Sequence, residues 1–439
     1  MARFFKPTKK TSFSKKHQEV NIERMDHHGA GIGYLNNKPV FVEGALTDEK
    51  VLVQLTESKA KFAKATLIKV LEASEQRVKP FCPHYHECGG CNQQHVERQQ
   101  QIENKQVALS QLMNKLAGQS VPLASSITGE GLGYRRRARL SIHLDKQRNL
   151  VMGFRRKQSN HIVEIDHCPV LNAQLNALIP PLRDIFTGFK QQQSLGHLEL
   201  VMGDNGPVVV VRHIKPLTNH DKKRLVEFAD SQALTLYLMP ESGQLQLITG
   251  EQPYYSEVGV ELPFLPTHFI QVNREINSKM VAQALEWLAP ESSDNVLDLF
   301  CGLGNFTLPL AKLCQRVVGV EGIQDMVDWA QQNATLNHLT NVEFYQANLE
   351  QDLSEMPWAK QQFDKILLDP ARAGASGVID QVSALGATRV LYVSCNPATL
   401  ARDTQSLIEQ GYNYKLVRLG MMDMFPHTSH LESMALFEK

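Results

Sequence analysis

The chain has 439 residues, of which 42% are hydrophobic and 21% are charged, and its formal net charge is zero. This length predicts two or three domains, and the composition is that of a globular protein rather than a disordered or fibrous one. No apolar run approaches the ~20 residues needed to cross a bilayer, and the first residues lack the apolar stretch of a secretory signal. We therefore expect a cytoplasmic protein that does not enter a membrane.

Charge is unevenly distributed along the chain. Residues 1–80 hold 15 Lys and Arg against 9 Asp and Glu, and residues 130–160 hold 9 against 2. Residues 291–439 reverse this balance, with 10 basic against 18 acidic side chains. A basic front and an acidic rear fit a polyanion-binding surface joined to a catalytic body, although solvated faces on unrelated domains would give the same counts.

The N-terminal region predicts a small β-barrel. Residues 1–16 are rich in Lys, Ser and Thr, which is typical of a flexible basic tail. Short strand-like runs follow at 19–22, 39–42 and 50–55, separated by turns that contain Gly and Asp. Several short strands in so few residues favour a barrel of the OB type, so we assign residues 1–74 to the tail and this domain. Such barrels commonly bind nucleic acid.

The rest of the chain divides into a mixed α+β region and an α/β region. Residues 75–270 contain a predicted helix at 97–118 and strand-like stretches at 138–144, 198–202 and 208–211. We consider the helix a candidate to pack on the C-terminal domain. From residue 271 to 439, strand and helix patterns alternate, which predicts a doubly wound parallel sheet. Its expected strands centre on 296–300, 317–320, 342–345, 365–368 and 390–393.

A glycine-rich turn, Asp298 to Asn305, follows the first of these strands. Glycines let the backbone approach a ligand closely, although a structural turn would also explain them. A dinucleotide site would carry a third glycine where Thr307 stands, so the turn fits the loop of S-adenosylmethionine (SAM) methyltransferases better. Glu321 ends the second strand, where it can accept hydrogen bonds from ribose hydroxyls, and Asn348 follows the third strand, where it can meet an adenine edge.

A thiol follows the fifth strand, in Ser394-Cys395-Asn396-Pro397. A cysteine at the carboxyl end of such a strand, just before a helix that starts with proline, is placed to act as a nucleophile. The alternative is a small buried thiol that merely ends a strand. A nucleophilic thiol needs a lowered pKa, and we expect the helix N-terminus to provide it.

Three motifs give the C-terminal domain a close resemblance to the RNA uracil-C5 methyltransferases. They are Leu368 to Gly374, Ser394 to Pro397 and His427 to Ser433, and Pro266 to Asn273 adds to the likeness at the entrance of the domain. The resemblance implies a SAM-dependent methyltransferase domain of Rossmann-like fold. It implies that Cys395 adds to carbon 6 of uracil and that Glu432 removes the proton from carbon 5; taken alone, Glu432 would be read as an exposed acid. It also implies contacts to SAM from Gln271, Phe300, Asn305, Glu321, Asn348 and Asp369.

Four other cysteines form a second candidate site. Cys82, Cys88 and Cys91 make a C-x5-C-x2-C run, and Cys168 follows further along the chain. Four thiols can hold zinc or an iron–sulfur cluster, or be unrelated, and nearby histidines keep a mixed zinc site open. The spacing does not match the paired cysteines of zinc knuckles. The resemblance implies a [4Fe-4S] cluster, which bacterial 23S rRNA uracil-C5 methyltransferases carry on such cysteines, with a structural or RNA-positioning role.

The resemblance extends to the RNA substrate. Asp26 to Gly33 and Val40 to Leu46 resemble a TRAM domain, an RNA-binding module of the larger family members. Together with the cysteines, and with Ala371 where the tRNA-modifying branch has a second proline, this implies a uridine of 23S rRNA as the target. We expect a monomer that acts on a single-stranded or loop segment with a flipped uridine. The basic runs 135–139 and 155–157 are candidates to bind phosphates, with a solvated face as the alternative.

Two other hypotheses compete with this one. The first is the same uracil-C5 methylation on another RNA, such as tRNA. The second is an RNA-binding protein that carries a cluster and whose methyltransferase domain only holds the fold. Intact Cys395, Glu432 and the glycine-rich turn speak against the second.

Overall fold

The computed structural model describes residues 16–439, which form two compact units. The first unit comprises the described residues up to 81 with 91–108 and 427–429, and the second comprises the remaining ones. The predicted basic tail falls outside the described residues, apart from Lys16. The division into three domains stays a prediction. No helix of the described part of the chain is long and apolar enough to span a membrane.

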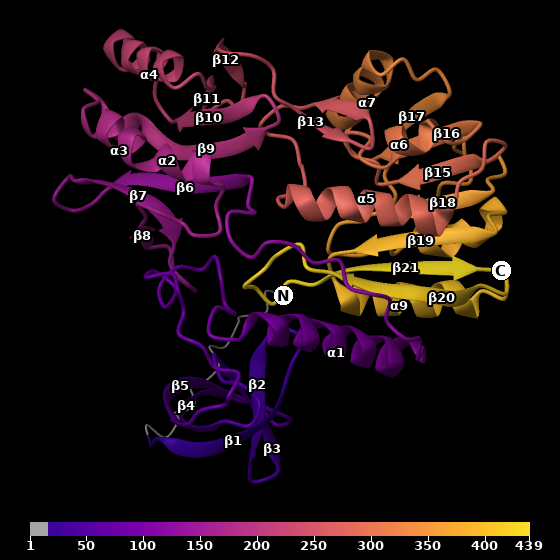
Figure 1. The fold of residues 1–439 in the computed structure, drawn as a ribbon, viewed down its shortest axis with the longest axis horizontal. Coiled ribbons are helices and arrows are strands. Elements are labelled where there is room, and N and C mark those ends of the chain that lie inside the picture. The colour runs from indigo at the N-terminus through magenta and orange to yellow at the C-terminus, as the bar shows by residue number, and fades with distance from the viewer. Residues whose placement is uncertain (1–15) are drawn as a thin grey trace, which may run out of the picture. The chain divides into compact units, whose positions relative to one another are not determined.

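The first unit contains the predicted β-barrel, which is closed in the order β1-β2-β3-β5-β4 (Figure 1). Alternate side chains such as Val20, Ile22, Val51 and Val53 fill its interior. Two of the strands, β2 and β5, were not predicted, because they lack the continuous apolar run by which the other three were recognised. The strands are β1 (Gln18–Met25), β2 (Ala30–Leu35), β3 (Lys38–Glu43), β4 (Lys50–Ser58) and β5 (Ala63–Glu72).

Close packing explains the glycines of β2. A Cβ atom on Gly33 would lie 2.2 Å from the carbonyl oxygen of Asn21, and one on Gly31 would lie 2.8 Å from Ile22 Cγ2. The barrel therefore needs glycine at points where its strands approach closely. Helix α1 (Arg98–Ala117) follows and matches the predicted helix to within one residue at each end. Its residues belong to both units.

The second unit begins with a mixed seven-stranded sheet in the order β12-β11-β10-β9-β6-β7-β8. Leu140, Leu198 and Val209 from its strands pack with Leu182, Phe186 and Leu225 from the helices that cover one face. The strands are β6 (Arg137–Leu144), β7 (Leu150–Arg155), β8 (Ile162–Glu164), β9 (Leu195–Gly203), β10 (Gly206–His213), β11 (Thr235–Pro240) and β12 (Gln246–Thr249). The helices are α2 (Ala173–Ala177), α3 (Ile179–Thr187) and α4 (Asn219–Ser231), with a 3-10 turn at Gln192–Ser194.

The second sheet of this unit has the order β17-β16-β15-β18-β19-β21-β20, with the first five strands parallel and β21 antiparallel to its neighbours. The five predicted strands are confirmed to within one residue at each end. The strands are β15 (Asn295–Leu299), β16 (Arg316–Glu321), β17 (Val342–Gln346), β18 (Lys365–Leu368), β19 (Arg389–Ser394), β20 (Lys415–Met422) and β21 (Glu432–Glu438). A hairpin of β13 (Tyr254–Glu257) and β14 (Val260–Pro263) precedes them.

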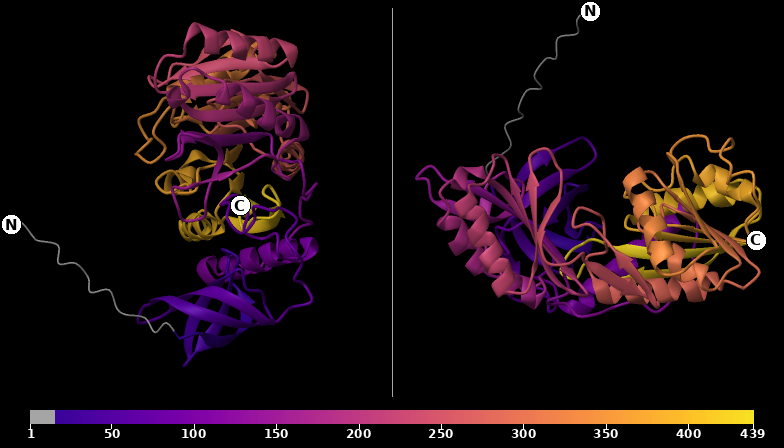
Figure 2. Two further views of the ribbon diagram at one scale, coloured as in Figure 1. Left: turned by 90° about the vertical axis from the view of Figure 1, so that its left-hand side faces the viewer. Right: turned by 90° about the horizontal axis from the view of Figure 1, so that it is seen from above.

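Helices cover both faces of this sheet, as a doubly wound fold requires (Figure 2). They are α5 (Arg274–Leu288), α6 (Thr307–Ala311), α7 (Gln324–Leu336), α8 (Ile379–Val382), a 3-10 turn at Ser383–Leu385, and α9 (Pro397–Glu409). The strand order reverses at β15, whose neighbours are β16 on one side and β18 on the other. Ligands of such sheets bind outside the carboxyl ends of the strands at this switch point. The loops after β15 and β18 are therefore the expected floor of a site.

Candidate active site

The predicted nucleophile and the predicted base lie at the ends of two paired strands, β19 and β21. Ser394, the last residue of β19, pairs with Ser433 of the antiparallel strand β21, and Ser433 Oγ donates to the Ser394 carbonyl at 3.2 Å. Cys395 follows Ser394 and Glu432 precedes Ser433 in the chain, and Glu432 is near enough to influence the Cys395 thiol electrostatically. Cys395 is partly exposed, whereas Glu432 is only 5% exposed and so is not the surface acid that its sequence position alone would suggest.

The electrostatic setting of Cys395 differs from the prediction. Burial and the nearby carboxylates of Glu432 and Asp369 raise the pKa of the Cys395 thiol to about 12, while Arg372 opposes them. The predicted lowering of this pKa was wrong, because desolvation and two acidic neighbours outweigh the start of a helix. Burial also raises the pKa of Asp369 to about 7. The thiol therefore stays protonated in the unliganded enzyme near neutral pH.

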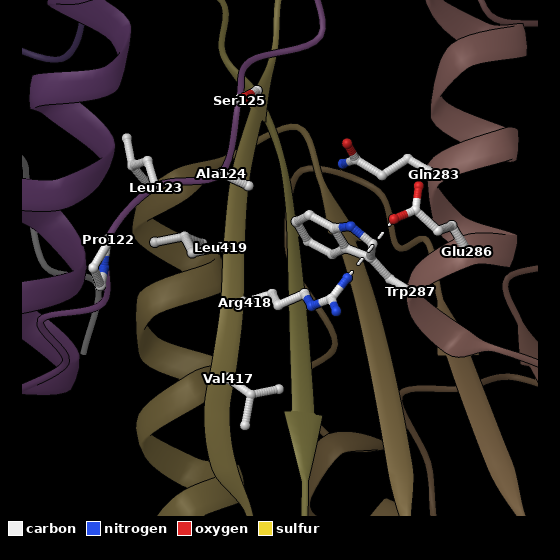
Figure 3. A pocket seen from close by; sticks show the side chains of 10 residues that line it. All are labelled: Pro122, Leu123, Ala124, Ser125, Gln283, Glu286, Trp287, Val417, Arg418 and Leu419. Carbon is white, nitrogen blue, oxygen red and sulfur yellow. Dashed lines mark ion pairs between the residues drawn. The ribbon is translucent and has the colours of Figure 1, made fainter.

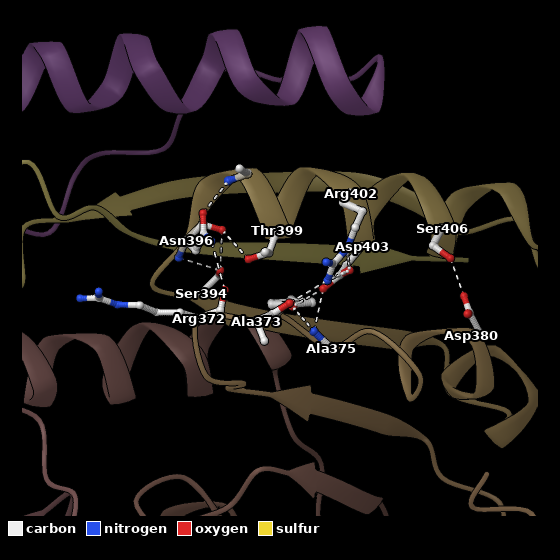
Figure 4. Close-up of polar contacts among 12 residues, drawn as sticks. Arg372, Ala373, Ala375, Asp380, Ser394, Asn396, Thr399, Arg402, Asp403 and Ser406 are labelled. Atoms are coloured by element: carbon white, nitrogen blue, oxygen red, sulfur yellow. Dashed lines mark hydrogen bonds and ion pairs between the residues drawn. The ribbon is translucent and has the colours of Figure 1, made fainter. Parts of the chain in front are cut away.

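A network of hydrogen bonds fixes the loop after β18 against α9 (Figure 4). Asn396 caps α9 by accepting from the Ala398 N–H at 3.1 Å, and its Nδ2 donates to the Arg372 carbonyl at 3.1 Å. Asp403 accepts from the Tyr392 hydroxyl at 2.6 Å and from the Ala375 N–H at 2.7 Å. These bonds hold the chain on both sides of Cys395, so its position relative to Asp369 is set by the fold.

The glycine-rich turn after β15 is strained in the way that ligand loops often are. Phe300 has a φ of 66°, which is unusual for an aromatic residue, and Gly302 and Gly304 have φ of 55° and 94°. A Cβ atom on Gly304 would also lie 2.9 Å from Leu308 Cγ. Backbone N–H groups of Phe300 and Cys301 bond to the Val320 carbonyl, at 2.8 and 3.1 Å. The turn is therefore tied to the adjacent strand β16.

The acidic residues of the predicted SAM site also lie at the carboxyl ends of their strands. Glu321, at the end of β16, accepts from the N–H groups of Gly302 at 3.2 Å, Gly322 at 2.8 Å and Ile323 at 3.1 Å. Asp369 follows β18 directly, and its N–H bonds to the Leu299 carbonyl at 3.2 Å. The exposed Asn348 follows β17. The structure thus brings these residues to one edge of the sheet, beside the glycine-rich turn.

Sequence reasoning missed a buried polar group behind Asn305. The Oδ1 atom of Asn305 accepts from the Tyr255 hydroxyl at 3.2 Å and from Asn277 Nδ2 at 3.1 Å. Asn277 Nδ2 also donates to Glu257 at 2.7 Å. A polar residue on the buried face of α5, next to Ile276, was the available signal, but a single asparagine is too common to be read alone.

One of the candidate phosphate-binding arginines is misassigned. Arg136 is only 3% exposed, so it cannot meet a phosphate at the surface. Arg137 is tied to Glu199 at 3.3 Å and to the His268 carbonyl at 2.5 Å. Arginine is rarely buried, and the sequence pattern gave no reason to separate Arg136 from its neighbours. Arg139, which is exposed by about half, stays a candidate.

Three of the four cysteines predicted to bind a cluster influence one another. Burial raises the pKa of Cys88 and of Cys168, and the neighbouring Cys82 raises both further. These three belong to the second unit and Cys91 to the first. No disulfide forms among the seven cysteines, all of which are described. Within residues 16–439 no group of three or more His, Cys, Asp or Glu side chains has the arrangement of a metal site. Clustered thiols are suitable ligands for iron or zinc.

A groove of about 410 Å³ lies beside the edge strand β20 (Figure 3). Arg418 lies over the Trp287 ring, with 5.8 Å between its guanidinium carbon and the ring centroid, and pairs with Glu286 at 3.9 Å. None of the predicted nucleophile, base or SAM residues lines this groove. It is therefore separate from the candidate active site.

The sheet order, the glycine-rich turn at the switch point and the acids beside it define a SAM-dependent methyltransferase. A solved structure of similar fold is the tRNA (uracil-54, C5)-methyltransferase of Pyrococcus abyssi in complex with S-adenosyl-L-homocysteine. It is 23% identical, with a TM-score of 0.75, and the match covers 96% of this chain and 100% of that one.

Sequence comparison gives the family. The model of the tRNA (uracil-5-)-methyltransferase family matches residues 97–439, and the TRAM domain model matches residues 13–68. The chain is 58% identical over 440 residues to the 23S rRNA (uracil(1939)-C(5))-methyltransferase RlmD of Vibrio parahaemolyticus, with both chains covered fully. Proteins of the same name from Vibrio cholerae and Aliivibrio fischeri are 60% and 53% identical, again over the full lengths. The chain belongs to this family of uracil-C5 methyltransferases, and the predicted TRAM domain is confirmed.

Proposed function

We propose that the protein transfers a methyl group from SAM to carbon 5 of one uridine in 23S rRNA. The relatives that match over the full length carry this activity in their names, and this chain itself matches the TRAM domain model. The position of Ala371, where the tRNA-modifying branch has proline, also favours rRNA. We also propose that the protein acts in the cytoplasm and that it is a monomer.

The observation that supports the mechanism is that Glu432 and Asp369 both lie close enough to Cys395 to influence its thiol. Carbon 5 of uracil is a poor nucleophile until a nucleophile adds to carbon 6. The thiol proton leaves first, and Asp369 is the nearby carboxylate that can accept it, which leaves Glu432 able to take the carbon 5 proton later. The sulfur then bonds to carbon 6, and the electrons of the carbon 5–carbon 6 double bond move toward oxygen 4.

Methylation and release complete the cycle. Bound SAM supplies an electrophilic methyl group on its sulfonium, which carbon 5 takes up, leaving S-adenosylhomocysteine. Glu432 then removes the proton from carbon 5, the carbon 5–carbon 6 double bond forms again, and the carbon 6–sulfur bond breaks with its electrons returning to Cys395. Because Glu432 is buried, a uridine within a duplex must be flipped out to reach the pair.

The proposed SAM contacts follow from the strand ends. Three backbone N–H groups fix the Glu321 carboxylate at the end of β16, where its remaining lone pairs can accept from ribose hydroxyls. Asn348 is exposed beyond β17 and can meet the adenine edge. The other proposed contacts come from the glycine-rich turn, the loop after β18 and the segment before α5, namely Phe300, Asn305, Asp369 and Gln271.

The substrate is tested by deleting the gene and digesting purified rRNA and tRNA to nucleosides for mass spectrometry. We expect 5-methyluridine to fall by one residue per 23S rRNA and to be unchanged in tRNA, and a plasmid copy should restore it. A plasmid copy of the Cys395→Ala variant is the matched control, and it should not restore 5-methyluridine. Loss from tRNA alone would overturn the choice of substrate in favour of the rival hypothesis.

We further propose that Cys82, Cys88, Cys91 and Cys168 bind a [4Fe-4S] cluster. The support is the electrostatic coupling of three of these thiols and the spacing of the run. Methyl transfer moves no electrons, so the cluster would hold the surrounding loops or position RNA. Protein purified without oxygen should be brown and contain about four irons and four sulfides per chain. The Cys168→Ser variant should lose most of the iron, whereas Cys314→Ser should retain it; stoichiometric zinc without iron would contradict the proposal.

A further inference from the structure

A buried cation and a buried carboxylate near Asn305 both lack a full set of partners. Arg136 is 3% exposed and Glu257 is 1% exposed. Among the described residues, the two Nη atoms of Arg136 have no hydrogen-bond partner, and the Oε2 atom of Glu257 has none either. Buried polar atoms are almost always hydrogen-bonded in folded proteins, and a buried charge is still more costly to leave unmatched. Two such groups in one place indicate a ligand that carries both charges.

The surrounding residues hold the Arg136 side chain in one position. Its Nε donates to the Gln271 carbonyl at 2.6 Å, and its guanidinium carbon lies 4.7 Å from the centroid of the Tyr255 ring. The Tyr255 hydroxyl in turn donates to Asn305 at 3.2 Å. The guanidinium is thus fixed at its inner nitrogen and stacked on one face, which leaves the outer two nitrogens to bind a ligand.

Hydrogen bonds from two residues of α5 hold the Glu257 side chain in place. Its Oε1 accepts from Asn277 at 2.7 Å and from Ser278 Oγ at 3.1 Å. Asn277 also exchanges hydrogen bonds with Asn305, at 3.1 Å in each direction. Arg136 and Glu257 influence each other electrostatically, yet no ion pair joins them in the described structure. The second oxygen of Glu257 is therefore the free acceptor of the pair.

We propose that Arg136 and Glu257 bind the amino-acid end of SAM, the guanidinium its carboxylate and the Glu257 carboxylate its ammonium group. This inference rests on the proposed function, in which Gln271 and Asn305 line the SAM site. An RNA phosphate would be repelled by Glu257 and could not reach an arginine this deeply buried. Uracil is neutral, and even its enolate would match only the guanidinium and leave the Glu257 carboxylate unmatched. A zwitterion satisfies both, and two opposite charges held by separate elements, β13 and the residue before β6, also fix its orientation.

The proposal is tested by calorimetric binding of three ligands to the full-length protein. They are S-adenosylhomocysteine, its decarboxylated analogue, and 5′-methylthioadenosine, which lacks the amino-acid end altogether. The wild type should bind S-adenosylhomocysteine at least about tenfold more tightly than the decarboxylated analogue, which is the size of effect expected for a charged hydrogen bond. Arg136→Met should remove this preference and leave the affinity for 5′-methylthioadenosine within about twofold. Glu257→Gln should weaken S-adenosylhomocysteine and leave 5′-methylthioadenosine unchanged.

Arg137→Met is the matched control, because this neighbouring arginine pairs with Glu199 instead and should leave all three affinities unchanged. If Arg136→Met does not fold, the wild-type preference between the first two ligands together with the effect of Glu257→Gln decides the question. Equal wild-type affinities, or a variant that weakens all three ligands alike, would overturn the inference and leave the proposed function standing. A wild type that binds none of the three would instead overturn the proposed SAM site, and the inference with it.

Discussion

The Glu432→Gln variant is expected to accumulate a covalent complex with its RNA while turnover falls by about 10²–10⁴-fold, the usual contribution of a general base. Neither the addition of Cys395 nor methyl transfer needs a base at carbon 5, but release of the product does. Glutamine keeps the size of the side chain and cannot take the proton. The complex is measured as RNA that stays with the protein on a denaturing gel, and methyl-labelled SAM should label it.

A matched control lies on the same strand. Glu438 pairs with Arg389 at 2.9 Å at the far end of β21, so Glu438→Gln removes a carboxylate without touching the site. We expect this variant to turn over normally and to form no stable complex. Free RNA together with normal turnover in Glu432→Gln would show that another group takes the proton, and would sink the assignment of Glu432.

The predictable parts of the fold are the strands that can be recognised from the pattern of their own residues. β15, β16, β18 and β19 are largely buried, so each appears as a short apolar run between turns. Their limits, and those of the edge strand β17, were predicted to within one residue. β2 of the barrel was not predicted, because its glycines are needed for close packing with β1. That contact cannot be read from the local sequence pattern. The antiparallel pair β20 and β21 was also not predicted as strands.

The residues of the site stay a prediction, and the electrostatics around Cys395 could not be predicted from the sequence. Cys395 and Glu432 were identified by a family resemblance, which gives roles without giving surroundings. The pKa of Cys395 depends on Asp369, which follows a different strand, and on Glu432, which returns by an antiparallel one. A helix N-terminus is visible in the sequence, whereas burial and the approach of distant acids are not. The burial of Arg136 was not predicted for the same reason, because it depends on contacts with Tyr255 and Gln271, which are distant in the sequence.

The raised pKa of Cys395 changes how its activation should be understood. A thiol that ionised freely would react with any electrophile in the cell. Because burial, Glu432 and Asp369 all favour the protonated form of the thiol, we expect Cys395 to act as a nucleophile only when a substrate or a nearby carboxylate takes its proton. The two acids therefore restrain the thiol in the free enzyme and can serve the reaction once RNA is bound.

Replacing Cys395 by Ala is expected to abolish methyl transfer, with a loss on the order of 10⁴-fold or more, as is usual when a covalent nucleophile is removed. Formation of the covalent complex should be lost as well, while binding of S-adenosylhomocysteine is retained. Cys314→Ala is the matched control, since burial also raises the pKa of that thiol to about 12 and it lies outside the site. Residual methylation within tenfold of the wild type would contradict the role of Cys395.

The pH dependence of Cys395 alkylation tests its electrostatics independently of RNA. With the pKa raised to about 12, the thiolate fraction is small at neutral pH and rises about tenfold for each unit of pH until it nears that value. Iodoacetamide labelling, followed by peptide mass spectrometry, should therefore accelerate from pH 7 to 10 without a plateau. Glu432→Gln removes a negative charge that raises this pKa, so its thiolate fraction and labelling rate at pH 8 should exceed those of the wild type. A plateau below pH 9 in the wild type, or slower labelling in the variant, would show that the acids do not restrain the thiol.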